Sequence, residues 1–349
     1  MNPNLPTITG IGSVTPFGPL AGLIPPSPLE PSLIAAWPTK GSRRAFLVNP
    51  FNPASVVSGL KIRRLDRLSA WALVASSLAL RDSGIDLKQV DRSRVAVVFA
   101  TGFGCIELTT SFFRSAFNNG WSGTDPITFP ETLANLPAGH VAILNDLRGP
   151  NITVSIKHFA AESALIQAAS LLRHGQADLA VVIAGDTVTQ AAYEWYETAK
   201  LLSPACYSSE PISESPGFIP SEGVVALVLE PSGNRMARSY AHFNTGRWAS
   251  GGDPYESVRQ MLGNTTPTIV IAAGNGAPCT TSSSNEPIAN LVTADAVMLP
   301  AEPVALGLTD TGALLHLVLA LSKKPAGGQA LMLATSGDSG FAALLLELP

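Results

Sequence analysis

The residues best placed to do chemistry stand at a bend between a strand and a helix near the middle of the chain. Residues 151–156 (NITVSI) are β-prone and alternate in hydrophobicity, residues 161–174 carry apolar side chains at helical spacing, and residues 178–185 form an apolar strand. The bend between the first two, residues 157–159, has the sequence KHF. A buried helix start exposes backbone N–H groups and the positive end of the helix dipole, where an acyl-transfer enzyme would hold a nucleophile whose anion needs stabilising. No Cys or Ser stands at this turn, and the missing nucleophile governs the interpretation of the whole chain.

Composition indicates a well-packed protein with a large apolar surface to cover. Of the 349 residues, 46% are hydrophobic and only 14% are charged. This allows one large or two modest cores, and it favours an extensive interface with another subunit. The net charge is −4, and the densest basic spot is formed by Arg63, Arg64 and Arg67. We therefore expect no nucleic-acid partner.

The three cysteines, Cys105, Cys206 and Cys279, are widely spaced and odd in number, so they predict neither a disulfide framework nor a metal site. Cys105 opens a predicted helix, which would lower the pKa of its thiol, although packing near a subunit interface is the preferred interpretation. The first ten residues lack the basic and apolar regions of a signal peptide. No apolar run reaches the ~20 residues that span a bilayer. We expect a cytoplasmic protein without a membrane span and without a cofactor.

Two successive units alternate strand and helix. In the first, the patterns predict strands within 6–18 and at 94–101 and 223–230, and helices over 67–82, 105–118, 134–146 and 187–201. In the second, they predict strands near 237–245, 267–273, 329–335 and 340–348, and helices over 254–263 and 311–323. The proline-rich stretch 19–53 is expected to form a surface loop. An α/β fold of two halves that share a core follows, with residues 1–232 as the larger half and residues 233–349 as the reduced one.

Several separated segments resemble the condensing enzymes, and more narrowly the β-ketoacyl-acyl carrier protein synthases. They are TITGIGSVTPFG, RRLDRLSAWALVASSLALRDSGID, VAVVFATGFGCIE, LPAGHVAILNDLRGPNITVS, LLRHGQADLAVVIAGD and SEGVVALVLE. The resemblance covers nearly the whole chain, is dense from 1 to 231 and is thin from 232 onward. It implies the thiolase-like fold, in which two stacked βαβ-type halves form α-β-α-β-α layers.

Members of that family are similar to one another in a Cys–His–His site with a supporting Lys. The Cys carries the acyl chain as a thioester, the His pair promotes loss of carbon dioxide, and backbone N–H groups hold the thioester oxyanion. Carried onto this chain, the resemblance places His158 at the nucleophile position, Ala273 and Leu308 at the His positions, and Pro303 where the Lys stands. The late Gly-rich stretch reads SGDSGFAAL, without the usual phenylalanine gate. All four chemical side chains are absent, so no condensation chemistry is expected.

Ketosynthase-like chains without the nucleophile resemble chain length factors, inactive subunits that pair with an active ketosynthase. The resemblance implies a heterodimer that acts with acyl carrier protein in fatty-acid- or polyketide-type elongation. In it, this subunit shapes the partner's tunnel, and strand 151–156 pairs end to end across the two-fold axis. The compact size resembles the partners found in aryl polyene systems. The candidate tunnel and interface residues are Phe103, Cys105, Ile106, Phe112, Phe113 and Phe117.

Two alternatives stay open. An atypical acyltransferase or thioesterase would use His158 with Glu162, one helical turn further on, or with Lys157. An acyl-imidazole hydrolyses readily, however, so the simpler interpretation is a histidine that fills the former cysteine pocket, hydrogen-bonded by Glu162 or by backbone. The second alternative is a scaffold that docks acidic carrier proteins through Arg63, Arg64 and Arg67.

The remaining polar candidates are expected to be structural. His140 lies on an apolar helix and is predicted to be a satisfied core histidine, whereas His174 and His242 are predicted to lie at the surface. His316 lies in an apolar helical stretch and is expected to be buried or at an interface. Glu222 resembles a structural turn of the family.

Overall fold

Two arms of strands meet at β1 (Pro6–Thr15), which is buried along its whole length. The computed structural model describes residues 5–25, 27, 29–34, 43–57, 65–207, 217–233, 239–249, 253–273, 291–323, 327–335 and 340–349. The first arm runs outward from β1 through β8 (Gly223–Pro231), β7 (Leu179–Asp186), β5 (Val95–Thr101) and β6 (Asn151–Ser155). The second arm runs through β9 (Ala241–Ala249), β13 (Phe341–Leu348), β12 (Gly328–Thr335), β10 (Ile269–Ala272) and β11 (Val297–Leu299). Only Thr7 and Ile8 of β1 pair with β9, so the two arms are nearly separate sheets.

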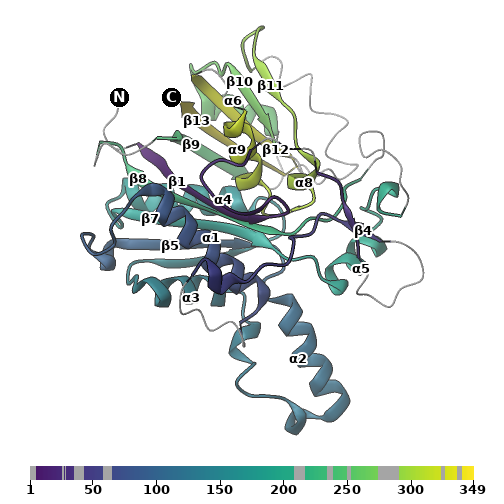
Figure 1. Ribbon diagram of the computed structural model, residues 1–349. Helices are drawn as coiled ribbons and strands as arrows, with labels where there is room; N and C mark the ends of the chain where they lie inside the picture. Colours follow the sequence, from purple (N-terminus) through teal and green to yellow (C-terminus); the bar gives the residue numbers. More distant parts are fainter. Residues whose placement is uncertain are drawn as a thin grey trace.

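Helices cover both arms and fill the space between them (Figure 1). Helices α1 (Arg67–Ser83) and α3 (Leu136–Asn145) pack on the first arm, and α6 (Pro254–Leu262) packs on the second. Helix α4 (Ala160–Arg173) contacts strands of both arms and also α9 (Ala313–Ser322). Both helices are largely buried because their apolar side chains face a sheet on either side. The predicted α-β-α-β-α layering is confirmed.

One segment projects away from this layered body (Figure 1). It consists of α2 (Ile106–Asn119) and two short 3-10 turns, η4 (Trp121–Gly123) and η5 (Pro130–Thr132). Phe112 is the one residue of α2 that is buried. A helix that carries three phenylalanines and lies outside the core of its own chain leaves much of its surface for another molecule.

The long periodic elements lie close to their predicted ranges, whereas several short elements were not predicted or have other bounds than predicted. The predicted loop 19–53 contains β2 (Gly18–Ala21), β3 (Ser32–Leu33) and β4 (Arg44–Ala45), and β2 forms a hairpin with β1. The strand predicted near 237–245 is displaced to β9 because its later residues pair with β13. Strand β11 and helix α8 (Pro303–Leu306) were not predicted, and α5 (Gln190–Thr198) is shorter than expected. The predicted boundary at residue 232 falls between β8 and β9 and stays a prediction.

Candidate functional site

Three of the four positions that the resemblance singled out line one small pocket between α4 and α9. The pocket has a volume of about 10 Å³, which is room for roughly one water molecule. Its lining includes His158, Glu162, Ala273, Leu308, Asp310 and His316. Pro303 lies elsewhere, at the first position of helix α8. Residues 336–339 of the late Gly-rich stretch lie outside the described residues.

The bend before α4 has an unusual backbone. His158 has φ 61° and Phe159 has φ 57°, so two successive residues that are not glycine adopt the left-handed conformation. Each such residue costs roughly 1–2 kcal/mol, and this cost is tolerated where the surrounding contacts fix the backbone. The His158 side chain is 41% exposed, so the histidine does not fill the pocket completely.

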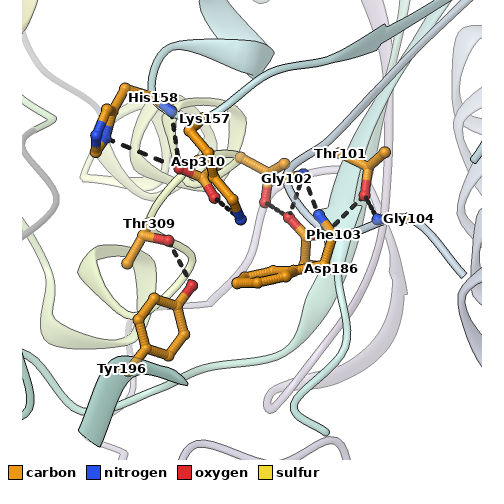
Figure 2. A network of polar contacts seen from close by, with 11 residues as sticks. Thr101, Gly102, Phe103, Gly104, Lys157, His158, Asp186, Tyr196, Thr309 and Asp310 are labelled. Carbon is orange, nitrogen blue, oxygen red and sulfur yellow. Dashed lines mark hydrogen bonds and ion pairs between the residues drawn. The ribbon is translucent and has the colours of Figure 1, made fainter. Parts of the chain in front are cut away.

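Asp310 supplies the contacts that fix this bend (Figure 2). Its Oδ1 accepts a hydrogen bond from the backbone N–H of His158 at 2.8 Å, and its Oδ2 accepts one from Nζ of Lys157 at 3.2 Å. Its backbone carbonyl oxygen accepts from the N–H groups of Ala160 at 3.1 Å and Ala161 at 3.4 Å. Sequence analysis named Glu162 or backbone as the partner of His158. That expectation for the His158 ring stays a prediction; in the structure, Nδ1 of the ring lies 3.9 Å from Oδ1 of Asp310.

A second buried carboxylate, Asp186 at the end of β7, holds the neighbouring segment. It accepts hydrogen bonds from Thr101 Oγ1 at 2.6 Å, from the Gly102 N–H at 3.0 Å and from Thr311 Oγ1 at 3.2 Å. Burial, together with the charge of Asp310, raises the pKa of Asp186 to about 6. Gly102 is required at its position because a Cβ there would lie 2.1 Å from Oδ2 of Asp310. The Asp310 segment is therefore held from both sides.

Lys157 connects the pocket to an aromatic cluster. Its Nζ lies 3.1 Å from the ring centroid of Phe103 and 5.6 Å from that of Trp195. Phe103 also packs edge-on against Tyr196, whose hydroxyl lies 2.7 Å from Thr309 Oγ1. Phe103 is thus part of the network around Asp310, as Figure 2 shows. Sequence analysis did not identify Asp186 or Asp310, although each is an acidic residue directly next to an apolar element.

Glu162, the alternative catalytic partner of His158, is buried. Burial raises the pKa of its carboxyl group to about 8, and the nearby charge of Asp310 acts in the same direction. The group is therefore mostly protonated at neutral pH. A protonated carboxyl group cannot take a proton from a histidine, so the pocket brings the two residues together without giving them a base.

The six predicted tunnel and interface residues occupy different environments. Cys105 is buried, with its Sγ 4.0 Å from Ser69 Oγ, and burial together with the charge of Asp66 raises its pKa to about 12. The burial agrees with packing, the preferred interpretation of Cys105, and desolvation outweighs the helix dipole, so the pKa is raised and not lowered. Ile106 is half-buried, and Phe112 is buried midway along α2. Phe113 and Phe117 point outward and are 48% and 90% exposed.

Exposed apolar side chains gather on the projecting segment. We call this set the α2 patch; its members are Phe113, Phe117, Trp121, Ile127, Phe129 and Leu133. Phe113 packs edge-on against Trp121, with ring centroids 6.5 Å apart, so part of the patch is preorganised. Strand β6 ends the first arm, pairs with β5 alone in the described sheet, and has both end residues exposed. Patch and edge strand are the features that a partner subunit would cover.

The arginine group expected to contact a carrier protein is only partly described. Arg63 and Arg64 lie outside the described residues. Arg67 is engaged within the chain: its Nη1 lies 3.0 Å from Oε2 of Glu222, its Nε lies 3.2 Å from Oε2 of Glu107, and its Nη2 donates to the carbonyl of Val188. Glu222 is buried and also accepts from the backbone, which confirms its structural role. Arg67 is therefore a structural residue in the described chain.

The remaining histidines are structural. His140 is half-buried and pairs with Glu131 at 2.9 Å, which agrees with a satisfied histidine at the edge of the core. His174 is exposed and His316 is buried on α9, as predicted. His242 was expected at the surface but is half-buried, with its Nδ1 2.8 Å from Thr7 Oγ1, because β9 pairs with β1 at this point.

The described ranges contain neither a membrane-spanning helix nor a metal-binding cluster. No helix there is both long enough and apolar enough to cross a membrane. His, Cys, Asp and Glu side chains form no group of three or more there that could hold a metal ion.

Comparison with known proteins defines the family. The model of the beta-ketoacyl synthase N-terminal domain matches residues 24–234, and the chain therefore belongs to the beta-ketoacyl synthase family. The 3-oxoacyl-[acyl-carrier-protein] synthase 2 of Vibrio cholerae is 28% identical over 203 residues, which cover 56% of this chain and 49% of the relative. The enzyme of the same name from Coxiella burnetii is 27% identical over 272 residues, which cover 72% and 64%. This chain thus spans about half the length of the first of these relatives.

Solved structures agree over the whole chain. The ishigamide ketosynthase/chain length factor matches with 25% identity and a TM-score of 0.75, covering 99% of both chains. A beta-ketoacyl synthase from Burkholderia phymatum matches in fold alone, with 16% identity and a TM-score of 0.76. A chain of the AntDE:AntF complex of a type II ketosynthase with its acyl-carrier protein also matches in fold alone, with 17% identity and a TM-score of 0.77. The fold is the thiolase-like fold of the ketosynthases, as the sequence predicted, and the chain resembles a chain length factor.

Proposed function

We propose that this chain is a noncatalytic ketosynthase-like subunit, a chain length factor, that pairs with an active β-ketoacyl-acyl carrier protein synthase and shapes its acyl or polyene tunnel. The observation that carries the proposal is the pocket at the nucleophile position. It holds His158 in place of a thiol and has a volume of about 10 Å³. The likeness to the ishigamide ketosynthase/chain length factor supports the same assignment.

The side chains around the pocket support the absence of condensation chemistry. Decarboxylation of a malonyl thioester needs paired hydrogen-bond donors next to the nucleophile, and Ala273 and Leu308 donate nothing. Both are buried in this lining. Sites that enclose drug-sized ligands have volumes of roughly 300–1,000 Å³, so this pocket does not accommodate an elongating acyl chain.

The outer surface supports pairing with another subunit. The α2 patch projects from the body, and strand β6 presents an open edge at the end of the first arm. Soluble proteins seldom leave such a patch and such an edge uncovered, and a stable interface buries upward of about 1,000 Å². In the proposed heterodimer, the β6 strands of the two subunits pair end to end and the α2 segments pack against the opposite subunit.

The expected tunnel residues divide into two groups under this proposal. Phe113 and Phe117 are exposed and would reach the partner's tunnel, whereas Phe103 and Cys105 face the interior of this chain. The acyl carrier protein would dock on the assembled heterodimer. The narrower assignment to an aryl polyene system is part of the proposal and rests on the resemblance alone.

Co-expression tests the proposal. The tagged chain is produced with a ketosynthase that retains its nucleophilic cysteine, the complex is isolated, and the product lengths made with and without the chain are compared. We expect a stable 1:1 complex and a change in product length. A chain that stays monomeric and leaves the product distribution unchanged would contradict the proposal.

The alternative function, acyl transfer at His158, predicts a different experimental result. Incubation with acyl thioesters would give a mass adduct that disappears in His158→Ala. The protonated state of Glu162 and the small pocket argue against such an adduct.

A further inference from the structure

We propose that Asp310 is a built-in anion that occupies the acyl-binding position of this chain and keeps it closed to acyl groups. The inference rests on the proposed noncatalytic function and extends it. Loss of the nucleophile alone would leave the anion-stabilising backbone groups of the bend available to a ligand, whereas Asp310 occupies the His158 N–H with its carboxylate and the N–H groups of Ala160 and Ala161 with its backbone carbonyl.

The hydrogen bonds of the bend carry the proposal. In an acyl-transfer site, the backbone N–H groups of a strained bend and of the following helix start are the donors that stabilise a thioester oxyanion. The N–H groups of His158, Ala160 and Ala161 all donate to oxygen atoms of Asp310. One residue from the segment before α9 thus takes three donors that an acyl group would use.

The charge balance fits a carboxylate at this position. Asp310 is buried, and a buried carboxylate persists where a cation and hydrogen-bond donors compensate it. Lys157 supplies the cation at 3.2 Å, and the Lys157 ammonium itself rests on the face of Phe103. The other titratable groups nearby are His158, Glu162, Asp186 and His316, and burial favours the neutral forms of Glu162 and Asp186. Asp186, with a pKa of about 6, is largely ionised at neutral pH as well, but it accepts hydrogen bonds from the neighbouring Thr101–Phe103 segment, so Asp310 is the anion that contacts the bend.

The space around the carboxylate is also fitted to it. Gly102 leaves room for Oδ2, which would lie 2.1 Å from a Cβ at that position. Ala273 and Leu308 line the pocket with apolar side chains. Asp310→Ala removes a group the size of formate and frees the His158 N–H and Lys157 Nζ, whereas Ala160 and Ala161 keep the backbone carbonyl as acceptor, so formate is the probe that matches the vacated position.

The first test measures thermal unfolding of the full chain in sodium formate against sodium chloride at equal ionic strength. We expect Asp310→Ala to unfold at a lower temperature than the wild type, and formate to recover at least half of that loss. Formate should leave the wild type unchanged. Asp310→Asn keeps an oxygen that can accept from the His158 N–H and fills the space, so it should not respond either. Equal responses of wild type and Asp310→Ala to formate, including no response in both, would overturn the proposal.

The second test introduces a thiol at the nucleophile position. Full chains with His158→Cys, and with His158→Cys plus Asp310→Ala, are incubated with an acyl N-acetylcysteamine thioester and followed by intact mass. In the exchange, the introduced thiolate attacks the carbonyl carbon, the acyl group moves to it, and the N-acetylcysteamine thiolate leaves and takes up a proton. Wild type gives the background from the native cysteines, and iodoacetamide reports whether the new thiol is accessible in both variants.

We expect at least tenfold faster acylation of the double variant, with similar alkylation of both. Equal acylation rates in the two variants, at any level, would overturn the proposal. If Asp310→Ala does not fold, Asp310→Ser withdraws the carboxylate while keeping a polar side chain and takes its place in both tests. If Asp310→Ala does not respond to formate but the wild type still pairs with a ketosynthase, this inference alone is overturned. If the chain does not pair with a ketosynthase but Asp310→Ala responds to formate, the proposed function alone is overturned.

Discussion

The α2 patch gives the sharpest prediction about pairing, because its side chains contribute little to the folded chain alone. Phe117 is 90% exposed. Replacing it with alanine should therefore change the free energy of unfolding of the isolated chain by less than about 0.5 kcal/mol. Full burial of a phenylalanine side chain at an interface contributes about 1.5–3 kcal/mol. Since each 1.4 kcal/mol is a factor of ten, Phe117→Ala should weaken ketosynthase binding roughly 10- to 100-fold.

The assay measures the dissociation constant for the ketosynthase by calorimetry and the thermal unfolding of the chain alone. Trp248→Ala is the matched control, because Trp248 is 44% exposed but lies on β9 of the second arm, and its loss should leave binding unchanged. Phe112→Ala provides the contrast within α2: this side chain is buried, so the variant should lose about 3–5 kcal/mol of folding stability. Unchanged binding of Phe117→Ala, or equal loss with Trp248→Ala, would refute the assignment of the patch as the interface.

Three further predictions concern the interior. Folding raises the pKa of Glu162 to about 8 from 4.5, so the folded state binds the extra proton between these values and stability falls as pH rises through that window. Glu162→Gln should remove this dependence. Between pH 5 and pH 8.5, the free energy of unfolding measured by chemical denaturation should fall by a few kcal/mol more for the wild type than for the variant. Equal falls in the two proteins would contradict the raised pKa. Gly102→Ala should destabilise the fold by at least about 2 kcal/mol because its Cβ meets the buried carboxylate of Asp310. Gly139→Ala, where nothing lies within 4 Å of the new Cβ, should be neutral or stabilising. A larger loss of stability in Gly139→Ala than in Gly102→Ala, measured by denaturant titration, would be inconsistent with this geometry. Glu222→Ala should lower the free energy of unfolding by about 3 kcal/mol because it leaves buried donors and Arg67 without their acceptor. Glu256→Ala removes an exposed ion pair and should show no measurable loss. Similar shifts in unfolding temperature for the two variants would show that burial does not distinguish the two pairs.

The sequence was most informative where a pattern repeats over many residues. Helices α1, α4 and α9 and the buried strands β5, β7 and β8 follow apolar periodicities, which depend on burial in the final fold. The short strands β2 and β11 depend on hydrogen bonds to a partner strand, and such pairing leaves no periodic signal over three or four residues.

Sequence reasoning likewise identified only some of the residues of the candidate site. The resemblance located the positions of His158, Ala273 and Leu308, which do meet in one pocket. The resemblance did not identify Asp310, whose carboxylate accepts from the backbone of the bend. Asp310 contacts the bend across more than 150 residues of sequence, and an acidic residue before a helix looks like an ordinary capping group until the fold brings the two segments together.

The most direct measurement of the central claim is decarboxylation and chain extension by the purified chain alone. Malonyl-acyl carrier protein labelled in the free carboxyl group is supplied with an acyl primer, and released carbon dioxide and extended product are followed with and without the cysteine-bearing ketosynthase. We predict that both appear only when the ketosynthase is present. Carbon dioxide release together with an extended product from the chain alone would contradict the account.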